Sequence, residues 1–161
     1  SMDNSPRNKH LGLAVDTSCE MAMFAGNLID IMDVLVKRGY EVTDYEKRRE
    51  GLEKDRSVLI EKINHYMWNE QDGFYYDMTF GERQTRIKTI AGFFPLVSGV
   101  ADEKQGKRLI EWLEDKETFN RVHRIPVVAA DEEGYDPRGG YWRGSADQCS
   151  RNLRTGEARL P

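Results

Sequence analysis

The chain has 161 residues, of which 39% are hydrophobic and 32% are charged, and its formal net charge is −4. These values are typical of a single water-soluble globular domain and exclude an intrinsically disordered chain. The slight negative charge gives no reason to expect a nucleic acid as partner. The most apolar segment, residues 21–36, is interrupted by one asparagine and two aspartates, so it does not predict a membrane span.

Cysteine usage and the N-terminal residues bear on the location of the protein and on metal binding. Cys19 and Cys149 are the only cysteines, too few for a disulfide framework and without the spacing of a metal site. The N-terminal residues lack the basic-then-apolar pattern of a secretion signal. We therefore expect a cytoplasmic protein that holds neither a metal ion nor another cofactor.

The first helix is expected to begin near Thr17 or Ser18 and to end at Arg38, because Gly39 is a common residue after a helix C-terminus. Its apolar residues follow helical spacing in a wide stripe, which predicts a helix buried on more than one side. These residues are Met21, Met23, Phe24, Leu28, Ile29, Ile31, Met32, Val34 and Leu35.

A second helix is expected from the capping-box pattern at residues 43–46 to about Trp68. Its short connection to the first helix predicts an antiparallel helical hairpin. A turn ending at Gly73 should follow. We expect residues 74–78 to form a short strand that pairs, through a turn at Gly81, with residues 84–87.

The next segments predict two further helices and a long loop. Residues 89–98 have the composition of a buried helix that Pro95 keeps short. Asp102 is expected to cap a helix that ends near Glu114. We expect its inward residues to be Leu109, Ile110 and Leu113. Residues 115–144 read mainly as loop, so the fold class is all-α, with helical hairpins and a small β-hairpin.

Residues 135–144 combine one proline, three glycines, two arginines and three aromatic residues. The glycines and proline exclude a helix or strand interior and predict a loop. Aromatic faces beside guanidinium donors suit a sugar ring, which has apolar faces and a belt of hydroxyl groups. A surface turn in which an arginine stacks on an aromatic ring would have the same composition, and the residues alone leave both interpretations open.

Carboxylates are the remaining candidates for chemistry, since no nucleotide-binding loop, zinc motif or Ser-His-Asp signature is present. Asp3, Asp16, Asp77 and Asp136 all lie in or beside expected loops. Two carboxylates held across a sugar-sized cleft could cleave a glycosidic bond by acid and base catalysis. Loop aspartates also commonly cap helices or face solvent, so this argument selects none of the four.

Four segments of the sequence stand out as motifs. They are Met2-Asp3-Asn4-Ser5-Pro6-Arg7, Trp68-Asn69-Glu70-Gln71-Asp72-Gly73-Phe74-Tyr75-Tyr76-Asp77, Ile90-Ala91-Gly92-Phe93-Phe94-Pro95-Leu96 and Gly139-Gly140-Tyr141-Trp142-Arg143-Gly144. They resemble glycoside hydrolase family 63, where they occur in the same order. That family includes processing α-glucosidases and mannosylglycerate hydrolases, and the trehalases are its relatives. The resemblance extends from residue 2 to about residue 145.

This resemblance implies that residues 1–144 form part of an (α/α)6 toroid with a sugar pocket at one end. It implies an inverting α-glycosidase that acts on a small carbohydrate, in which one carboxylic acid protonates the leaving oxygen and a second carboxylate activates water. Asp3 maps onto the general acid. The substrate-binding residues implied by the resemblance are Arg7, Asp16, Tyr141, Trp142 and Arg143.

The resemblance fails after residue 144. The family has its general base on a glutamate C-terminal to the Tyr-Trp-Arg-Gly loop, and Glu157 is a poor match for it. Residues 145–161 show no hydrophobic period, so we expect a disordered or aberrant tail, such as a frameshifted reading of a longer gene. These features predict an incomplete catalytic domain that is inactive alone, and whose exposed apolar helix faces favour a homo-oligomer.

Two other interpretations stay open. The chain could be a non-catalytic helical module that binds carbohydrate or another protein. It could also be an inert gene fragment that folds by dimerising. The choice among glucosides, mannosylglycerate and trehalose-like substrates is equally open, because their selectivity depends on segments outside these residues.

Overall fold

The computed structural model describes residues 5–9, 12–122, 125–139 and 142–144, and the structural statements below concern this part of the chain. It is mainly helical, with one two-stranded antiparallel sheet. No helix in these ranges is long and apolar enough to cross a membrane. The elements are the 3-10 helices η1 (Pro6–Lys9) and η2 (Ile90–Phe93), the helices α1 (Val15–Lys37), α2 (Tyr45–Tyr66), α3 (Phe94–Ser98) and α4 (Glu103–Glu114), and the strands β1 (Trp68–Asn69) and β2 (Phe74–Tyr75).

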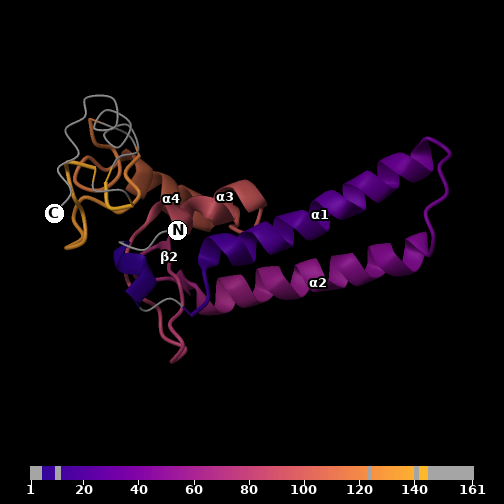
Figure 1. Cartoon of the computed structure of the whole chain (residues 1–161), viewed down its shortest axis with the longest axis horizontal. Helices are drawn as coiled ribbons and strands as arrows, with labels where there is room; N and C mark the ends of the chain where they lie inside the picture. The colour runs from indigo at the N-terminus through magenta and orange to yellow at the C-terminus, as the bar shows by residue number, and fades with distance from the viewer. Residues whose placement is uncertain (1–4, 10–11, 123–124, 140–141, 145–161) are drawn as a thin grey trace, which may run out of the picture.

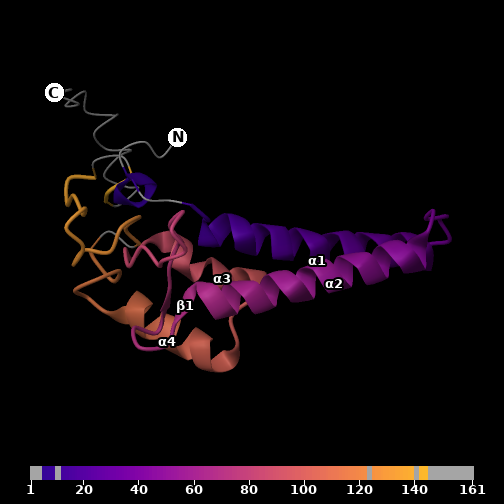
Figure 2. The ribbon, with the colours of Figure 1, turned by 90° about the horizontal axis from the view of Figure 1, so that it is seen from below.

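Helices α1 and α2 form a long antiparallel hairpin, as the sequence predicts, and we call this hairpin the helical arm. The arm projects from the rest of the molecule, which we call the body (Figure 1). The same arrangement is visible after a quarter turn, with α3 lying against the base of the arm and α4 farther from it (Figure 2). The core therefore lies where the arm joins the body.

Helix α1 begins at Val15, and the prediction of a start at Thr17 or Ser18 is wrong. Ala14 is the N-cap residue, and it makes no side-chain capping bond. The N–H of Val15 instead donates to Oδ1 of Asp77 at 2.8 Å, across 62 residues of sequence. A cap from so distant a residue leaves no local signal. The C-terminal prediction agrees better, because α1 ends at Lys37 and Gly39 adopts a positive φ of 82°.

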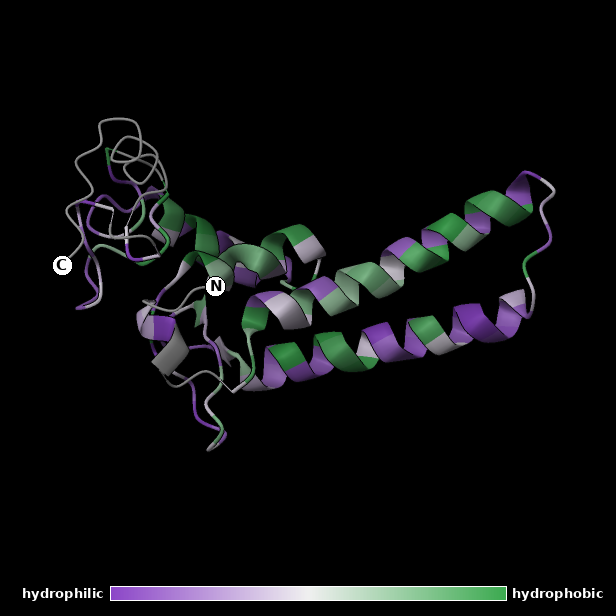
Figure 3. Cartoon of the chain, viewed as in Figure 1, coloured by the Kyte–Doolittle hydropathy of each residue, from purple (hydrophilic) through white to green (hydrophobic). Residues whose placement is uncertain are grey.

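Only one narrow stripe of α1 is buried, so the prediction of burial on more than one side is wrong. The buried residues are Val15, Cys19, Ala22, Ala25 and Ile29. By contrast, Met21, Phe24 and Ile31 are each more than half exposed. Apolar colour accordingly extends along α1, whereas α2 is largely hydrophilic (Figure 3). The wide apolar pattern of α1 thus exceeds what α2 and α3 cover.

Helix α2 runs from Tyr45 to Tyr66, close to its predicted ends, but the predicted capping box does not form. Asp44 is the N-cap residue with φ of 54°, a left-handed conformation, and it makes no side-chain capping bond. The far end of the arm is instead closed by Asp33, which accepts hydrogen bonds from Tyr45 Oη at 2.7 Å and Arg49 Nε at 3.2 Å.

The predicted strand exists, but its main partner differs from the predicted one. Strand β2 pairs with β1, so that Trp68 faces Tyr75 and Asn69 faces Phe74. The turn between them closes through Gly73, whose N–H donates to the Asn69 carbonyl at 2.8 Å and whose φ is 66°. Part of the predicted pairing is present as a bridge between residues 78 and 84 and a hydrogen bond from the Thr85 N–H to the Asp77 carbonyl at 2.9 Å.

The remaining helices follow the sequence more closely. The helix predicted over residues 89–98 is split into η2 and α3, with Pro95 in the first turn of α3, where its missing N–H is tolerated. Helix α4 begins with a complete capping box between Asp102 and Gln105. Leu109 is fully buried as predicted, but Ile110 is 48% exposed, so its predicted inward position is wrong.

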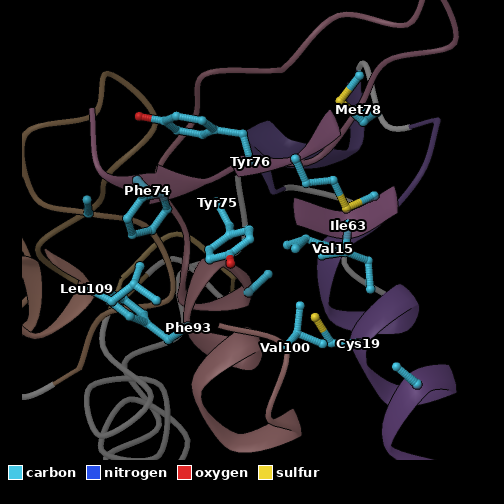
Figure 4. Packing of buried hydrophobic residues seen from close by; sticks show 14 of the residues in the cluster. Val15, Cys19, Ile63, Phe74, Tyr75, Tyr76, Met78, Phe93, Val100 and Leu109 are labelled. Atoms are coloured by element: carbon cyan, nitrogen blue, oxygen red, sulfur yellow. The ribbon is translucent and has the colours of Figure 1, made fainter. Parts of the chain in front are cut away.

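Aromatic side chains fill the core on the body side. Figure 4 shows Phe74, Phe93 and Leu109 on one side of Tyr75, and residues of α1 on the other. The centroid of the Phe93 ring lies 5.3 Å from that of Phe74 and 4.8 Å from that of Phe119, and both pairs are edge-to-face. Gly92 permits this packing, since a Cβ there would lie 2.3 Å from the Phe74 ring. The second and third of the four resembling segments are therefore packed directly together.

Candidate functional site

Arg7 lies at the centre of a buried ion-pair cluster at the base of the arm. Its Nη1 donates to Asp16 Oδ2 at 2.7 Å, its Nη2 donates to Asp77 Oδ1 at 2.8 Å, and its Nε pairs with Asp77 Oδ2. Arg7 and Asp77 are 3% and 2% exposed. A guanidinium group has a rigid fork of N–H donors, which suits it to hold two carboxylates in fixed positions. The cluster therefore joins η1, the first turn of α1 and a residue just after β2.

The electrostatics favour the charged forms of Arg7 and Asp16. Burial by itself would lower the pKa of Arg7, but the hydrogen bonds and charges of Asp16 and Asp77 outweigh it and raise that pKa above its ordinary value. Burial likewise opposes ionisation of Asp16, yet the hydrogen bond and charge of Arg7 bring its pKa below the usual range. Asp16 is thus a fixed anion, and its side chain is still 22% exposed.

These positions bear on two predicted site residues. Asp16 reaches the surface, so it is available to a polar ligand. Arg7 directs its guanidinium at two carboxylates, which makes it a support beneath the site, and its contact with a substrate stays a prediction. Asp3, the predicted general acid, lies outside the described residues and is two positions before Ser5 in the sequence.

The loop of residues 134–144 is closed by hydrogen bonds within it and by one from Val127. The N–H of Asp136 donates to the Arg143 carbonyl at 2.9 Å, and the N–H of Val127 donates to the Gly144 carbonyl at 3.0 Å. Arg143 Nε donates to the Gly134 carbonyl at 2.9 Å. Gly144 is required here, since a Cβ on it would lie 2.2 Å from the Asp136 carbonyl oxygen. The described residues of the predicted loop therefore form an ordered turn.

Its side chains divide between support and exposure. A hydrogen bond from the backbone N–H of Arg138 lowers the pKa of Asp136, which makes this aspartate a stabiliser of the loop. Arg143 uses Nε inside the loop. Trp142 is 40% exposed, as a residue that stacks on a ligand must be. Tyr141 lies outside the described residues.

The loop lies directly against the N-terminal segment. A Cβ on Gly134 would be 2.4 Å from Cγ of Pro6, so the backbone at Gly134 packs closely against the Pro6 ring. The N–H of Ile90 donates to the Val127 carbonyl at 2.9 Å, and Val127 in turn binds Gly144. The first, third and fourth segments are thereby joined. Sequence reasoning missed that Asp77, the last residue of the second segment, is the partner of Arg7.

The other features of the described chain add no second candidate centre. Within these ranges, no group of three or more His, Cys, Asp and Glu side chains is placed to hold a metal ion. An open groove of about 780 Å³ lies between the arm and α3, with Asp30, Glu53 and Arg56 among its lining residues. It contains none of the predicted site residues.

Comparison with known families identifies the chain. A family model described as "Mannosylglycerate hydrolase MGH1-like glycoside hydrolase domain" matches residues 23–146. The chain belongs to this family. An uncharacterized protein of Borreliella burgdorferi is 39% identical over 84 residues, which cover 52% of this chain and 18% of that protein. A cytosolic neutral trehalase of Kluyveromyces lactis is 35% identical over 60 residues, which cover 37% of this chain and 8% of that protein.

Solved structures share the fold of this chain. A glycoside hydrolase family 63 mannosylglycerate hydrolase of Thermus thermophilus, solved with Tris and D-glycerate, has a TM-score of 0.57 and 21% identity over 81% of this chain. A neutral trehalase of Saccharomyces cerevisiae has a TM-score of 0.58 and 20% identity over 75% of this chain. The matches cover 29% and 22% of those two chains. They confirm the expected fold, part of an (α/α)6 glycosidase, and the chain spans less than a third of these family relatives.

Proposed function

We propose that this glycoside hydrolase chain supplies one side of the sugar pocket of an inverting α-glycosidase. The observation that supports this most is the contact between Pro6 and Gly134. It holds the loop of residues 134–144 against the segment that begins with Asp3, and the Arg7 cluster belongs to the same segment. A pocket wall and a catalytic acid must be held in a fixed relation for a near-attack geometry, and a junction at Pro6, three residues after Asp3 in the sequence, supports the proposal that they are.

In this proposal each part has a distinct task. Asp3 is the general acid that protonates the glycosidic oxygen as its bond to the sugar breaks. Asp16 accepts hydrogen bonds from sugar hydroxyl groups, because an ionised carboxylate has acceptor sites only. Trp142 stacks on an apolar sugar face, and Tyr141 and Arg143 complete the wall. Arg7 and Asp77 hold these groups in place.

The second carboxylate, which activates water on the opposite face of the sugar, is proposed to come from elsewhere in a longer protein. Acid–base groups contribute about 10² to 10⁴ in rate each, so this chain alone should show no measurable turnover. The names of the relatives support small α-linked substrates of the mannosylglycerate or trehalose type. The Kluyveromyces lactis relative is named as cytosolic, which supports a cytoplasmic location.

Sugar binding and turnover test the proposal separately. We expect the folded chain to bind a sugar from a panel of α-glucosides and α-mannosides with a change in tryptophan fluorescence, and Trp142→Ala to abolish that binding. In a longer protein that contains this segment, Asp3→Asn should remove reducing-sugar release. Binding without any effect of Asp3→Asn would favour a carbohydrate-binding module. A folded chain that binds no sugar would refute the proposal.

We further propose that the isolated chain self-associates through the exposed stripe of α1. Met21, Phe24 and Ile31 are 54%, 57% and 55% exposed on one helix, and water-exposed apolar stripes of this kind favour association. Light scattering should give a mass above that of one chain. Phe24→Glu with Ile31→Glu should return a monomer, whereas Val58→Glu on α2 should not. A monomeric wild-type chain at high concentration would contradict this proposal.

A further inference from the structure

Lys88 is nearly buried and binds the segment that leads into the loop of residues 134–144. Its side chain is 14% exposed. The Nζ atom lies 2.5 Å from Asp131 Oδ2 and 3.5 Å from a carboxylate oxygen of Glu132. The same atom lies 4.9 Å from the centre of the Trp112 ring, on α4. The ammonium group is therefore held by two anions and one aromatic face.

The backbone of Lys88 binds the same segment. Its N–H donates to Glu132 Oε1 at 2.9 Å, and its carbonyl accepts a hydrogen bond from the Ala129 N–H at 3.0 Å. Backbone and side chain of one residue thus fix residues 129–132. The Trp112 ring that faces the ammonium group is fixed as well, because its Nε1 donates a hydrogen bond to the Asp72 carbonyl at 3.1 Å.

Residues 129–132 lead directly into the loop of residues 134–144 and contact its first residues. The N–H of Tyr135 donates to the Glu132 carbonyl at 2.9 Å, and Gly134 lies on Pro6. We propose that Lys88 is a positioning residue that fixes the loop of residues 134–144 against η1. The part of this inference that concerns sugar rests on the proposed function.

We call the contacts of Lys88 with Asp131, Glu132 and Trp112 the clamp. Comparison with an exposed ion pair shows why the clamp is strong. Lys107 and Glu103 also form an ion pair at 2.7 Å, but their side chains are 71% and 85% exposed. Exposed pairs are screened by water and contribute little. The Lys88 side chain is 14% exposed and lies over an aromatic face, and its partners Asp131 and Glu132 are 39% and 18% exposed, so this group is screened less and interacts more strongly. Loss of the Lys88 ammonium group also leaves Glu132 without this charged partner.

Hydrogen exchange tests the positioning role directly. In Lys88→Met, amide exchange in residues 129–139 should rise about tenfold or more, as expected for losing charge-assisted hydrogen bonds, while exchange in the arm stays unchanged. Lys88→Arg should restore protection, because a guanidinium group can bind both carboxylates and stack on Trp112. Lys107→Met is the matched control and should leave the loop unaffected.

Two results would overturn the inference. An equal rise in exchange of loop and arm would mean that Lys88 only stabilises the fold globally. Unchanged exchange in residues 129–139 would mean that the clamp does not hold the loop. Sugar affinity, measured in parallel, should fall in Lys88→Met and recover in Lys88→Arg. If the wild-type chain binds no sugar, the proposed function fails, and the exchange data still decide the role of Lys88.

Discussion

Removing the charge of Asp77 should destabilise the chain more than any similar change at its surface. Asp77 accepts hydrogen bonds from Arg7 Nε, Arg7 Nη2 and the N–H of Val15, and it is 2% exposed. Asn has the same shape but only one acceptor oxygen. Its amide group would therefore place a donor opposite an N–H group of Arg7 or Val15 and leave the guanidinium charge partly unpaired.

The magnitude follows from the remaining partners. Breaking a buried ion pair costs about 3–5 kcal/mol when the surviving charge has no partner. Arg7 keeps Asp16, so the loss of stability in Asp77→Asn should be near the lower end, about 3 kcal/mol. Because small domains have a free energy of unfolding of about 5–15 kcal/mol, such a loss should be easy to measure.

Urea unfolding followed by circular dichroism measures this loss, with Asp33→Asn as the matched control. Asp33 also binds an arginine and a hydroxyl donor, but its side chain is 40% exposed and water can replace its partners. We expect the control to unfold close to the wild-type midpoint. Equal shifts in the two variants, or a loss below about 1 kcal/mol for Asp77→Asn, would refute a tightly coupled buried cluster.

Three further outcomes are expected. Gly92→Ala should lower the free energy of unfolding, because the new Cβ would collide with the Phe74 ring and the Tyr75 carbonyl. Gly106→Ala in α4 should raise it by up to about 1 kcal/mol, because the nearest atom lies 3.5 Å from the new Cβ. Equal effects in thermal unfolding would contradict the close packing at Gly92. The pKa of Asp16 is lower in the folded chain than its ordinary value of 3.8. The stabilisation by ionised Asp16 is therefore complete above pH 3.8 and is lost as the pH falls through the folded-state pKa. In acid unfolding, the difference in stability between the wild type and Asp16→Asn should shrink over that pH range. Burial raises the pKa of Cys19 to about 11, so its thiol should react slowly in the folded chain. In a Cys149→Ser background, the folded chain should resist iodoacetamide at about pH 8, and the unfolded chain should react. Rapid labelling of the folded chain would contradict the burial of Cys19.

The sequence predicted the fold best where local chemistry determines it. The end of α1 shortly before Gly39 and the capping of α4 by Asp102 depend on residues within one helical turn, and both are confirmed. The start of α1 could not be found this way, because its capping group is Asp77. The partner of β2 was also missed, since the turn at Gly73 competes with a second turn at Gly81 and tertiary contacts decide between them.

The membership of the candidate site stays a prediction, and its geometry could not be derived from the sequence. Asp16 and Trp142 are partly exposed, as residues that contact a ligand must be. Periodicity and spacing cannot show that Arg7 points into a buried cluster, because its second partner is 70 residues away. The same limit applies to Lys88, whose charged partners Asp131 and Glu132 belong to a loop that has no hydrophobic pattern.

The position of the cluster at the start of α1 explains how one cation can hold two anions in a largely buried place. Arg7 balances only one of the charges of Asp16 and Asp77. The excess negative charge lies where a helix N-terminus presents partial positive charge, and the Val15 N–H donates directly to Asp77. A shift of α1 would remove this compensation and disturb Arg7 in the same step. The arm therefore supports the cluster electrostatically as well as by packing, and changes at its base should be transmitted to the segment that begins with Asp3.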